Sequence, residues 1–166
     1  ISVESEIGKG STFSFRVNFA IAERIPVEQN QGETQKFIRI FAGKKILLVE
    51  DNLINLQMTK EILEQLGFAA DTAESGFVAL QKVEEKFFDV ILIDIRMPEM
   101  DGYETTRRIR ALPGAEKLPI IALSADAVEG VAEKAKGSGM NEYLTKPLNP
   151  LKLIAVLQKY FEIEVI

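Results

Sequence analysis

One stretch of the sequence constrains the fold more than any other: four apolar residues, Val90 to Ile93, lead directly into Asp94. An unbroken apolar run of this length is typical of a strand that is buried on both faces of a parallel sheet. A carboxylate at the end of a buried strand costs free energy unless a cation or hydrogen-bond donors lie opposite it. We therefore expect the rest of the chain to supply groups that stabilise the charge of Asp94.

Similar apolar strands alternate with amphipathic helices from Gly43 onward. Strands are predicted over residues 46–49, 68–73, 88–94, 118–123 and 142–145, and helices over residues 53–66, 76–86, 102–112, 127–136 and 149–161. This alternation predicts an α/β fold, in which right-handed connections place helices on both faces of a doubly wound parallel sheet. In such folds, binding sites lie beyond the carboxyl ends of the strands.

The apolar residues of the helices predict which side chains face the sheet. Inward positions are expected at Phe77, Leu80 and Val83 in one helix, and at Leu151, Ile154, Leu157 and Phe161 in the last one. In the first helix Leu53, Ile54 and Leu56 cannot all face inward, so an exposed apolar group suited to a partner helix is expected there. Core packing is an equally good explanation for any one of the three. Arg107, Arg108 and Arg110 are expected to form a solvated face.

Polar residues follow the predicted strands at the point where each strand ends. These residues are Glu50 and Asp51, Asp94, Ser124, and Lys146. Clustered carboxylates repel one another, and a hard divalent cation such as Mg2+ relieves that repulsion through oxygen ligands. A lysine and a hydroxyl beside them suit phosphoryl oxygens. The set therefore favours a site for phosphoryl transfer to Asp94.

Each of these residues also has a simpler explanation when it is taken alone. A carboxylate or hydroxyl at a strand end, such as Asp94 or Ser124, commonly caps the next helix. Glu50 and Asp51 could favour the helix dipole, and Lys146 could be a surface lysine. Their occurrence together at successive strand ends favours the site over these explanations.

Composition excludes several other functions. The net charge of −5 argues against non-specific binding of nucleic acid. The sequence has no Cys and no His, which removes disulfides, the common zinc sites and any phosphohistidine made on this chain. No apolar stretch approaches the length of a membrane span and no signal peptide is evident, so no membrane contact by this chain and a cytoplasmic location are expected, with the parent protein anchored in an inner membrane as one possibility.

Four motifs together resemble the receiver domain of two-component signalling. They are Leu47–Asn52, Asp94–Gly102, Ala122–Ala125 and Tyr143–Pro147, within a resemblance that covers about Gly43 to Phe161. The resemblance implies a flavodoxin-like fold with five parallel strands in the order 2-1-3-4-5 and five helices.

The resemblance also implies a role for each matching residue. Asp94 is implied as the phosphoacceptor, and Mg2+ as the cofactor. Asp51 and Asp94 are implied as metal ligands, with Glu50 acting nearby through water and the Arg96 backbone carbonyl as a further ligand. Arg96, two positions past the acceptor, is also implied to tune the lifetime of the phosphate.

Three further residues receive roles from the same resemblance. Ser124 and Lys146 are implied to hold the phosphoryl oxygens during catalysis. Tyr143 is implied as the switch aromatic, which turns inward as Ser124 moves toward the phosphate. The Lys146–Pro147 peptide bond is implied to be cis.

The first part of the chain carries a second, shorter resemblance. Val3–Phe13 is similar to the last glycine box and final strand of a histidine-kinase ATP-binding domain, and residues 13–21 alternate as a half-buried strand does. A Gly-rich turn before an edge strand is the alternative. We therefore expect an ATP-binding-domain remnant over residues 1–21, a linker over residues 22–42 and a receiver domain over residues 43–163. The isolated strand must be covered by this domain or by a second copy, as in a homodimer.

The expected function is phosphorelay signalling within a hybrid histidine kinase, a transferase whose catalytic core this chain lacks. A phosphohistidine on a kinase dimerisation domain is the expected donor, and a histidine phosphotransfer domain the expected acceptor. One alternative is a docking domain that works without phosphate. The other is an Asp-nucleophile phosphatase, which is disfavoured because its second acid, two positions past the nucleophile, is replaced by Arg96.

Overall fold

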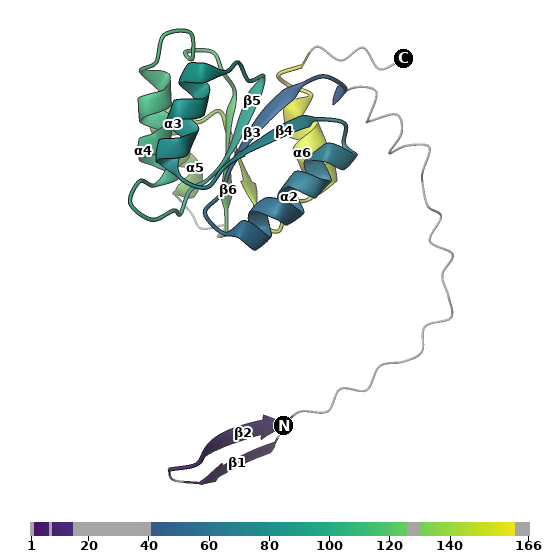
Figure 1. Cartoon of the computed structure of the whole chain (residues 1–166), viewed down its shortest axis with the longest axis vertical. Helices are drawn as coiled ribbons and strands as arrows, with labels where there is room; N and C mark the ends of the chain where they lie inside the picture. The colour runs from purple at the N-terminus through teal and green to yellow at the C-terminus, as the bar shows by residue number, and fades with distance from the viewer. Residues whose placement is uncertain (1, 7, 15–40, 126–129, 162–166) are drawn as a thin grey trace, which may run out of the picture. The chain divides into compact units, whose positions relative to one another are not determined.

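The computed structural model describes residues 2–6, 8–14, 41–125 and 130–161 (Figure 1). The chain divides into two compact units, Ile1–Asn30 and Gln31–Ile166. In the described part of the first unit, β1 (Ser2–Glu6) and β2 (Gly10–Ser14) form an antiparallel hairpin. Sequence analysis predicted a strand over residues 13–21. Of these, Phe13 and Ser14 end β2 and pair with Val3 and Ser2 of β1, a strand that was not predicted, and residues 15–21 lie outside the described part.

The second unit is built on a five-stranded parallel sheet. Its strands are β3 (Lys45–Val49), β4 (Ala69–Ala73), β5 (Val90–Asp94), β6 (Ile120–Ser124) and β7 (Glu142–Thr145). Their order across the sheet is β4-β3-β5-β6-β7, with all neighbours parallel. Counted along the unit, this is the order 2-1-3-4-5, so the predicted doubly wound fold is confirmed.

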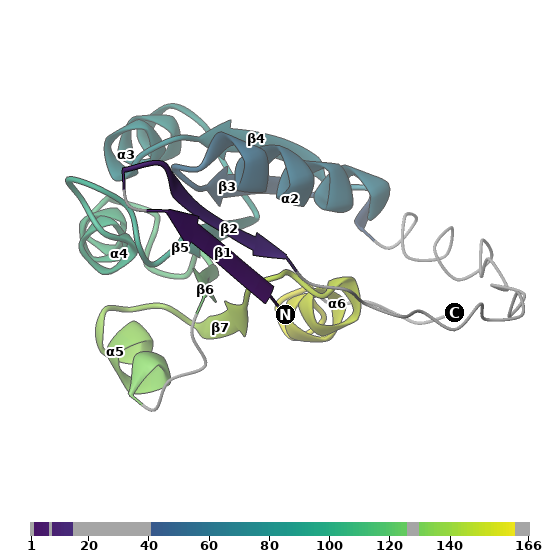
Figure 2. The same cartoon turned by 90° about the horizontal axis from the view of Figure 1, so that it is seen from below.

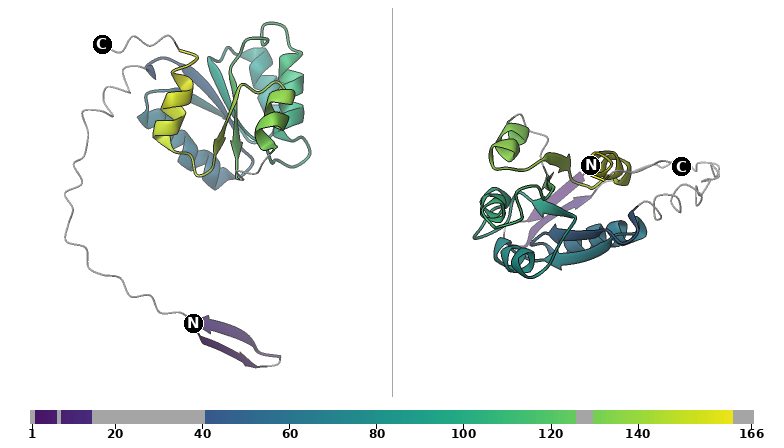
Figure 3. Two further views of the ribbon diagram at one scale, coloured as in Figure 1. Left: turned by 180° about the vertical axis from the view of Figure 1, so that it is seen from behind. Right: turned by 90° about the horizontal axis from the view of Figure 1, so that it is seen from above.

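Five helices cover the two faces of this sheet. They are α2 (Leu53–Gln65), α3 (Gly76–Glu85), α4 (Gly102–Arg110), α5 (Val131–Gly137) and α6 (Pro150–Leu157). Helices α2 and α6 lie on one face and α3, α4 and α5 on the other (Figures 1 and 2). The view from behind in Figure 3 shows α5 and α6 separated by the sheet. Residues 126–129, where the prediction began α5, lie outside the described part.

Side-chain caps fix where four of these helices begin. Asn52, Ser75, Asp101 and Asn149 each accept hydrogen bonds from backbone N–H groups of the first turn of α2, α3, α4 and α6. Each cap satisfies donors that have no partner within the helix. Because the capping residues directly follow strands or the loops at strand ends, they also set where the first turn of each helix lies relative to the sheet edge.

The alternating sides of the central strands divide the core in two. In β3, Ile46 and Leu48 belong to the cluster under α2 and α6, whereas Leu47 and Val49 belong to the cluster under α3, α4 and α5. All four side chains are fully buried. Both faces of the central strands therefore need apolar residues, which explains the unbroken apolar runs in the sequence.

Phe41 belongs to the core although it precedes the first strand. Its ring stacks on Phe68 at a centroid distance of 4.6 Å and meets Phe161 edge-on at 5.9 Å. It is completely buried. It lies within residues 22–42, which were expected to form a linker, and the apolar residues Phe37, Ile38 and Ile40 just before it lie outside the described part.

Three inward or outward assignments from the sequence are wrong. Phe77 and Leu151, expected to face the sheet, are 52% and 68% exposed. Each lies in the first turn of its helix, just beyond the carboxyl edge of the sheet. Arg110, expected on a solvated face, instead donates hydrogen bonds to the carbonyl oxygens of Ala115, Leu118 and Gly139.

Two further predictions concern the backbone and the membrane. The Lys146–Pro147 peptide bond is cis, as predicted. Among the helices in the described part of the chain, none is long and apolar enough to cross a membrane.

Candidate functional site

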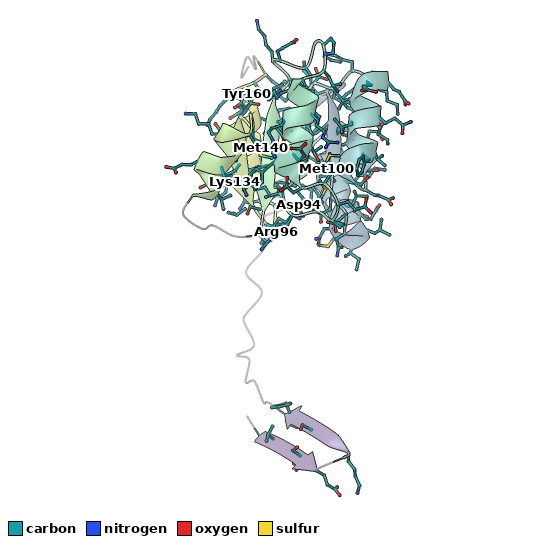
Figure 4. All side chains as sticks on the ribbon, turned by 90° about the vertical axis from the view of Figure 1, so that its left-hand side faces the viewer. Asp94, Arg96, Met100, Lys134, Met140 and Tyr160 are labelled. Carbon is teal, nitrogen blue, oxygen red and sulfur yellow. The ribbon has the colours of Figure 1, made fainter. Side chains whose placement is uncertain are left out.

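The carboxyl ends of four parallel strands bring the predicted polar residues to one edge of the sheet. Asp94 is the last residue of β5 and Ser124 the last of β6. Glu50 and Lys146 directly follow β3 and β7. Figure 4 shows Asp94 at one end of this unit and Tyr160 at the opposite end.

Lys146 is the cation that lies opposite Asp94. Its Nζ donates to Asp94 Oδ2 at 2.6 Å and also to Glu50 Oε2. The side chains of Glu50 and Asp94 are only 2% and 10% exposed. Burial by itself would lower the pKa of Lys146, but the two carboxylates outweigh burial and raise its pKa above the ordinary value. Lys146 is therefore charged at neutral pH and neutralises part of the acidic cluster.

Glu50 is held on both of its carboxylate oxygens. Its Oε1 accepts a hydrogen bond from Asn55 Nδ2 at 3.1 Å, while Oε2 faces Lys146. Asn55 lies in the first turn of α2. Sequence analysis did not single out Asn55, although its place five residues after Glu50, in the helix that begins there, was a usable signal.

The loop after Asp94 is held close to the Asp94 side chain. Arg96 N–H donates to Asp94 Oδ1 at 3.1 Å, and Gly102 N–H donates to the Ile95 carbonyl at 2.9 Å. A Cβ atom on Gly102 would lie 2.3 Å from the Asp94 carbonyl oxygen, so only glycine fits there without a backbone shift. Glu99 adopts a left-handed backbone conformation, with φ of 63°.

Three carboxylates at this edge form a group that could hold a metal ion. One oxygen each from Glu50, Asp51 and Asp94 lies within 4.8 Å of the others, and Asp51 is the most exposed of the three. Oxygen ligands with an open side toward solvent suit Mg2+, which keeps several waters and needs few protein carboxylates. The donor set therefore fits the predicted cofactor.

Ser124, Tyr143 and Arg96, for which roles were also predicted, differ in exposure. Ser124 is buried, Tyr143 is 41% exposed, and Arg96 is exposed. Ser124 and Arg96 also line a cavity of about 520 Å³ beside the loop after Asp94, together with Tyr103 and Lys134. The ammonium of Lys134 lies 4.4 Å from the centre of the Tyr103 ring, a cation–π contact between α5 and α4 that the sequence did not reveal.

Known proteins resemble this chain in sequence and fold. The family model "Response regulator receiver domain" matches residues 46–158. The receiver domain of the sensor histidine kinase PA1611 from Pseudomonas aeruginosa, with a magnesium ion coordinated in its active-site cleft, superposes with a TM-score of 0.67 and 41% identity; the match covers 72% of this chain and 98% of that one. The receiver domain of the histidine kinase CKI1 from Arabidopsis thaliana, complexed with Mg2+ and BeF3-, gives a TM-score of 0.68 and 31% identity over 76% and 95%.

Curated relatives include much longer histidine kinases. The signal transduction histidine-protein kinase BarA of Escherichia coli is 36% identical over 115 residues, which is 69% of this chain but 12% of BarA. A hybrid signal transduction histidine kinase of Dictyostelium discoideum is 40% identical over 119 residues, 69% of this chain and 5% of the kinase. The chain thus spans a small fraction of the length of these relatives. Fold, site geometry and family match agree: the chain belongs to the response regulator receiver domain family.

Proposed function

We propose that this receiver domain acts in a phosphorelay, with Asp94 as the residue that accepts the phosphoryl group. The observation that carries the proposal is the pairing of Asp94 with Lys146 at 2.6 Å, inside a cluster that also holds Glu50 and Asp51. A buried carboxylate with a fixed cation on one side and further acidic groups on the other is suited to receive a phosphoryl group, because the site already balances concentrated charge.

Transfer requires that one bond forms as another breaks. An Asp94 carboxylate oxygen attacks phosphorus in line, and the phosphorus–nitrogen bond to a donor histidine breaks, with its electron pair returning to the imidazole. When bound, Mg2+ supplies positive charge that neutralises the acceptor and the phosphoryl group together. Asp51 and Asp94 would hold it directly, Glu50 through water, and Arg96 through its backbone carbonyl.

Lys146 and Ser124 support the transferred group. Lys146 stabilises negative charge on the phosphoryl oxygens. To do so, its ammonium must give up part of its hydrogen bonding to Glu50 and Asp94. The Ser124 hydroxyl lies at the end of the neighbouring strand and donates to another phosphoryl oxygen. Tyr143, 41% exposed in this structure, turns inward as Ser124 moves, which switches the surface around β7.

The relatives also suggest the setting of this domain. Residues 1–21 would be the end of a histidine-kinase ATP-binding domain, residues 22–42 a linker, and residues 43–163 the receiver, all within a hybrid kinase. A phosphohistidine of the kinase core would be the donor. The acceptor would be a histidine phosphotransfer domain, docked on the exposed side chains of Leu53 and Ile54, which are 60% and 71% exposed.

Binding of Mg2+ and beryllofluoride tests this function. The wild-type chain should bind both, and it should be labelled by a small phosphodonor only when Mg2+ is present. Asp94→Asn should abolish labelling, because the amide is no nucleophile. Asp71→Asn removes a carboxylate on β4 that pairs with Lys82 and Lys86 instead, so it should keep full labelling as a matched control.

Three results would contradict the proposal. Undiminished labelling of Asp94→Asn would show that another residue accepts phosphate. Absence of Mg2+ and beryllofluoride binding by the wild type would favour docking without phosphate. Rapid multiple turnover of p-nitrophenyl phosphate would instead indicate a phosphatase.

A further inference from the structure

Two asparagines connect the start of α2 to the buried carboxylate of Glu50. Asn52 Oδ1 caps the helix by accepting the backbone N–H groups of Ile54 and Asn55, at 3.0 and 3.1 Å. This cap fixes the backbone of the first turn. From that turn, Asn55 Nδ2 donates to Glu50 Oε1 at 3.1 Å. The helix cap therefore positions the amide that contacts the carboxylate.

The backbone of Glu50 is fixed, but its side chain needs contacts of its own. Glu50 N–H donates to the Ala73 carbonyl of β4 at 3.0 Å, which anchors the main chain. A glutamate side chain still has three rotatable bonds, and it loses their freedom when it is held in one place. Lys146 restrains Oε2, but Lys146 also pairs with Asp94, so its contact with Glu50 is shared.

The chemistry of the pair defines which group Asn55 presents. An ionised carboxylate only accepts hydrogen bonds, so the amide must turn its nitrogen toward Glu50. A donor on Oε1 leaves Oε2 to accept from Lys146 Nζ, which also pairs with Asp94 in the same acidic cluster. Leucine has nearly the shape of asparagine but no donor, so it can separate this contact from packing.

We propose that Asn55 is a positioning residue of the metal site, which holds Glu50 so that its second oxygen is directed at the Mg2+ position. This proposal rests on the proposed function of the site. When Lys146 turns toward the phosphoryl oxygens, Asn55 keeps Glu50 in place, so the carboxylate does not follow the lysine. Side chains that hydrogen-bond to the residues around a metal ion, and so orient them, typically contribute a factor of about 10 to 100 in metal affinity.

The decisive experiment measures Mg2+ affinity by NMR titration of 15N-labelled chain with MgCl2, which also shows that each variant is folded. Asn55→Leu should bind Mg2+ about tenfold more weakly than wild type. Its unfolding midpoint in metal-free buffer should fall no more than that of Asn149→Ala, since the greater helix preference of leucine offsets part of the lost hydrogen bond. Asn52→Ala should weaken both Mg2+ binding and stability, because the cap positions Asn55.

Asn149→Ala is the matched control. Asn149 caps α6 as Asn52 caps α2, accepting from Leu151 and Lys152 N–H at 2.9 and 3.1 Å, and its helix supplies none of the three clustered carboxylates. This variant should lose stability but keep the wild-type Mg2+ affinity.

The outcomes separate this inference from the function on which it rests. Wild-type affinity in Asn55→Leu, or equal weakening in Asn55→Leu and Asn149→Ala, would overturn the role of Asn55 while leaving the receiver function intact. Weakening in Asn52→Ala alone would also overturn it, because the effect would then belong to the helix end. If the wild type itself bound no Mg2+, the proposed function would fail, and this inference with it.

Discussion

Arg110 Nη2 donates a hydrogen bond to Asn141 Oδ1 at 2.8 Å, and the same oxygen accepts Ile120 N–H at 2.8 Å. The side chain of Arg110 thus joins the end of α4 to the starts of β6 and β7. Its other donors reach the carbonyl oxygens of Gly139, Ala115 and Leu118. Burial lowers the pKa of Arg110, but the guanidinium remains charged at neutral pH. One arginine therefore satisfies several backbone acceptors at once.

Removing this arginine should destabilise the domain. Arg110→Leu is expected to lower the free energy of unfolding by about 2–4 kcal/mol, because partly buried carbonyl groups lose charged donors. Arg108→Leu, on the same helix, removes a pair with exposed Glu104 and should have a much smaller effect. Urea unfolding followed by circular dichroism measures both. Equal losses in the two variants would show that Arg110 acts only as a surface charge.

The glycine that ends the loop after Asp94 should not tolerate a methyl group. Gly102→Ala would bring Cβ to 2.3 Å from the Asp94 carbonyl oxygen and 3.0 Å from Ile95 Cα, so the backbone must shift. We expect a loss of about 1–3 kcal/mol in unfolding free energy, together with weaker Mg2+ binding. Gly137→Ala, in α5, meets no atom within 4 Å and should leave Mg2+ binding unchanged, with stability equal or slightly higher.

Glu99 offers the opposite test, since its backbone favours a different residue. With φ of 63°, the left-handed conformation is unfavourable for most side chains, but asparagine adopts it readily. Glu99→Asn should raise the unfolding free energy by about 0.5 kcal/mol. Glu99→Val should lower it by about 1 kcal/mol or more, since β-branched residues are strained there. Thermal unfolding that ranks valine above asparagine would contradict this.

Stability should depend on acid pH through Asp71. Burial alone would raise the pKa of Asp71, but hydrogen bonds from Lys82, Lys86 and Thr72 outweigh it and lower the pKa from 3.8 to about 2. A carboxyl group whose pKa is lowered by folding stabilises the folded state at pH values above its pKa in the unfolded chain. This stabilisation is lost as the pH falls from about 4 toward 2. Allowing for solvent screening, we expect about 1 kcal/mol.

A comparison of wild type with Asp71→Asn measures this contribution. The difference in unfolding free energy should be largest above pH 4 and shrink as the pH approaches 2. Lys82→Met removes the ion pair with an N–O distance of 2.6 Å, so the pKa of Asp71 is lowered less; the pH-dependent loss should then be smaller and should be complete at a higher pH. A difference that stays constant with pH would show that Asp71 contributes through packing instead.

Phe41 should contribute as much to the free energy of unfolding as a buried residue within the sheet. Phe41→Ala removes a ring that is completely buried between Phe68 and Phe161, with an expected loss of about 3 kcal/mol. Phe87→Ala is the matched control, because Phe87 is 74% exposed and should change stability by less than about 0.5 kcal/mol. A loss confined to Phe87→Ala would contradict the packing described for Phe41.

The sheet could be predicted from sequence because its rules are local. The apolar runs of β3, β5 and β6 alternate with helices, and parallel strands place all their carboxyl ends at one edge. This was enough to predict that Glu50, Asp94, Ser124 and Lys146 meet, although these residues are far apart in the chain. The resemblance to receiver domains then supplied their expected roles, which remain proposals.

What the sequence did not predict depends on geometry that no local pattern carries. The partners of Arg110 are carbonyl groups in loops, which leave no signature in residue type. Phe77 and Leu151 have helical spacing, but the first turns of α3 and α6 lie past the strand ends, so the sheet does not cover them. Asn55 requires the helix cap and the exit of β3 to be known together before its contact with Glu50 can be seen.

The contact between Lys146 and Glu50 joins residues that are 96 positions apart in the chain. During synthesis, Glu50 and Asp94 both leave the ribosome long before Lys146 does. Until β7 joins the sheet, the two carboxylates have no ammonium between them, and closing so long a loop is slow. A partly made receiver would therefore carry Asp94 and Glu50 without the ammonium that balances their charge, so this site is complete only when the last strand of the sheet is in place.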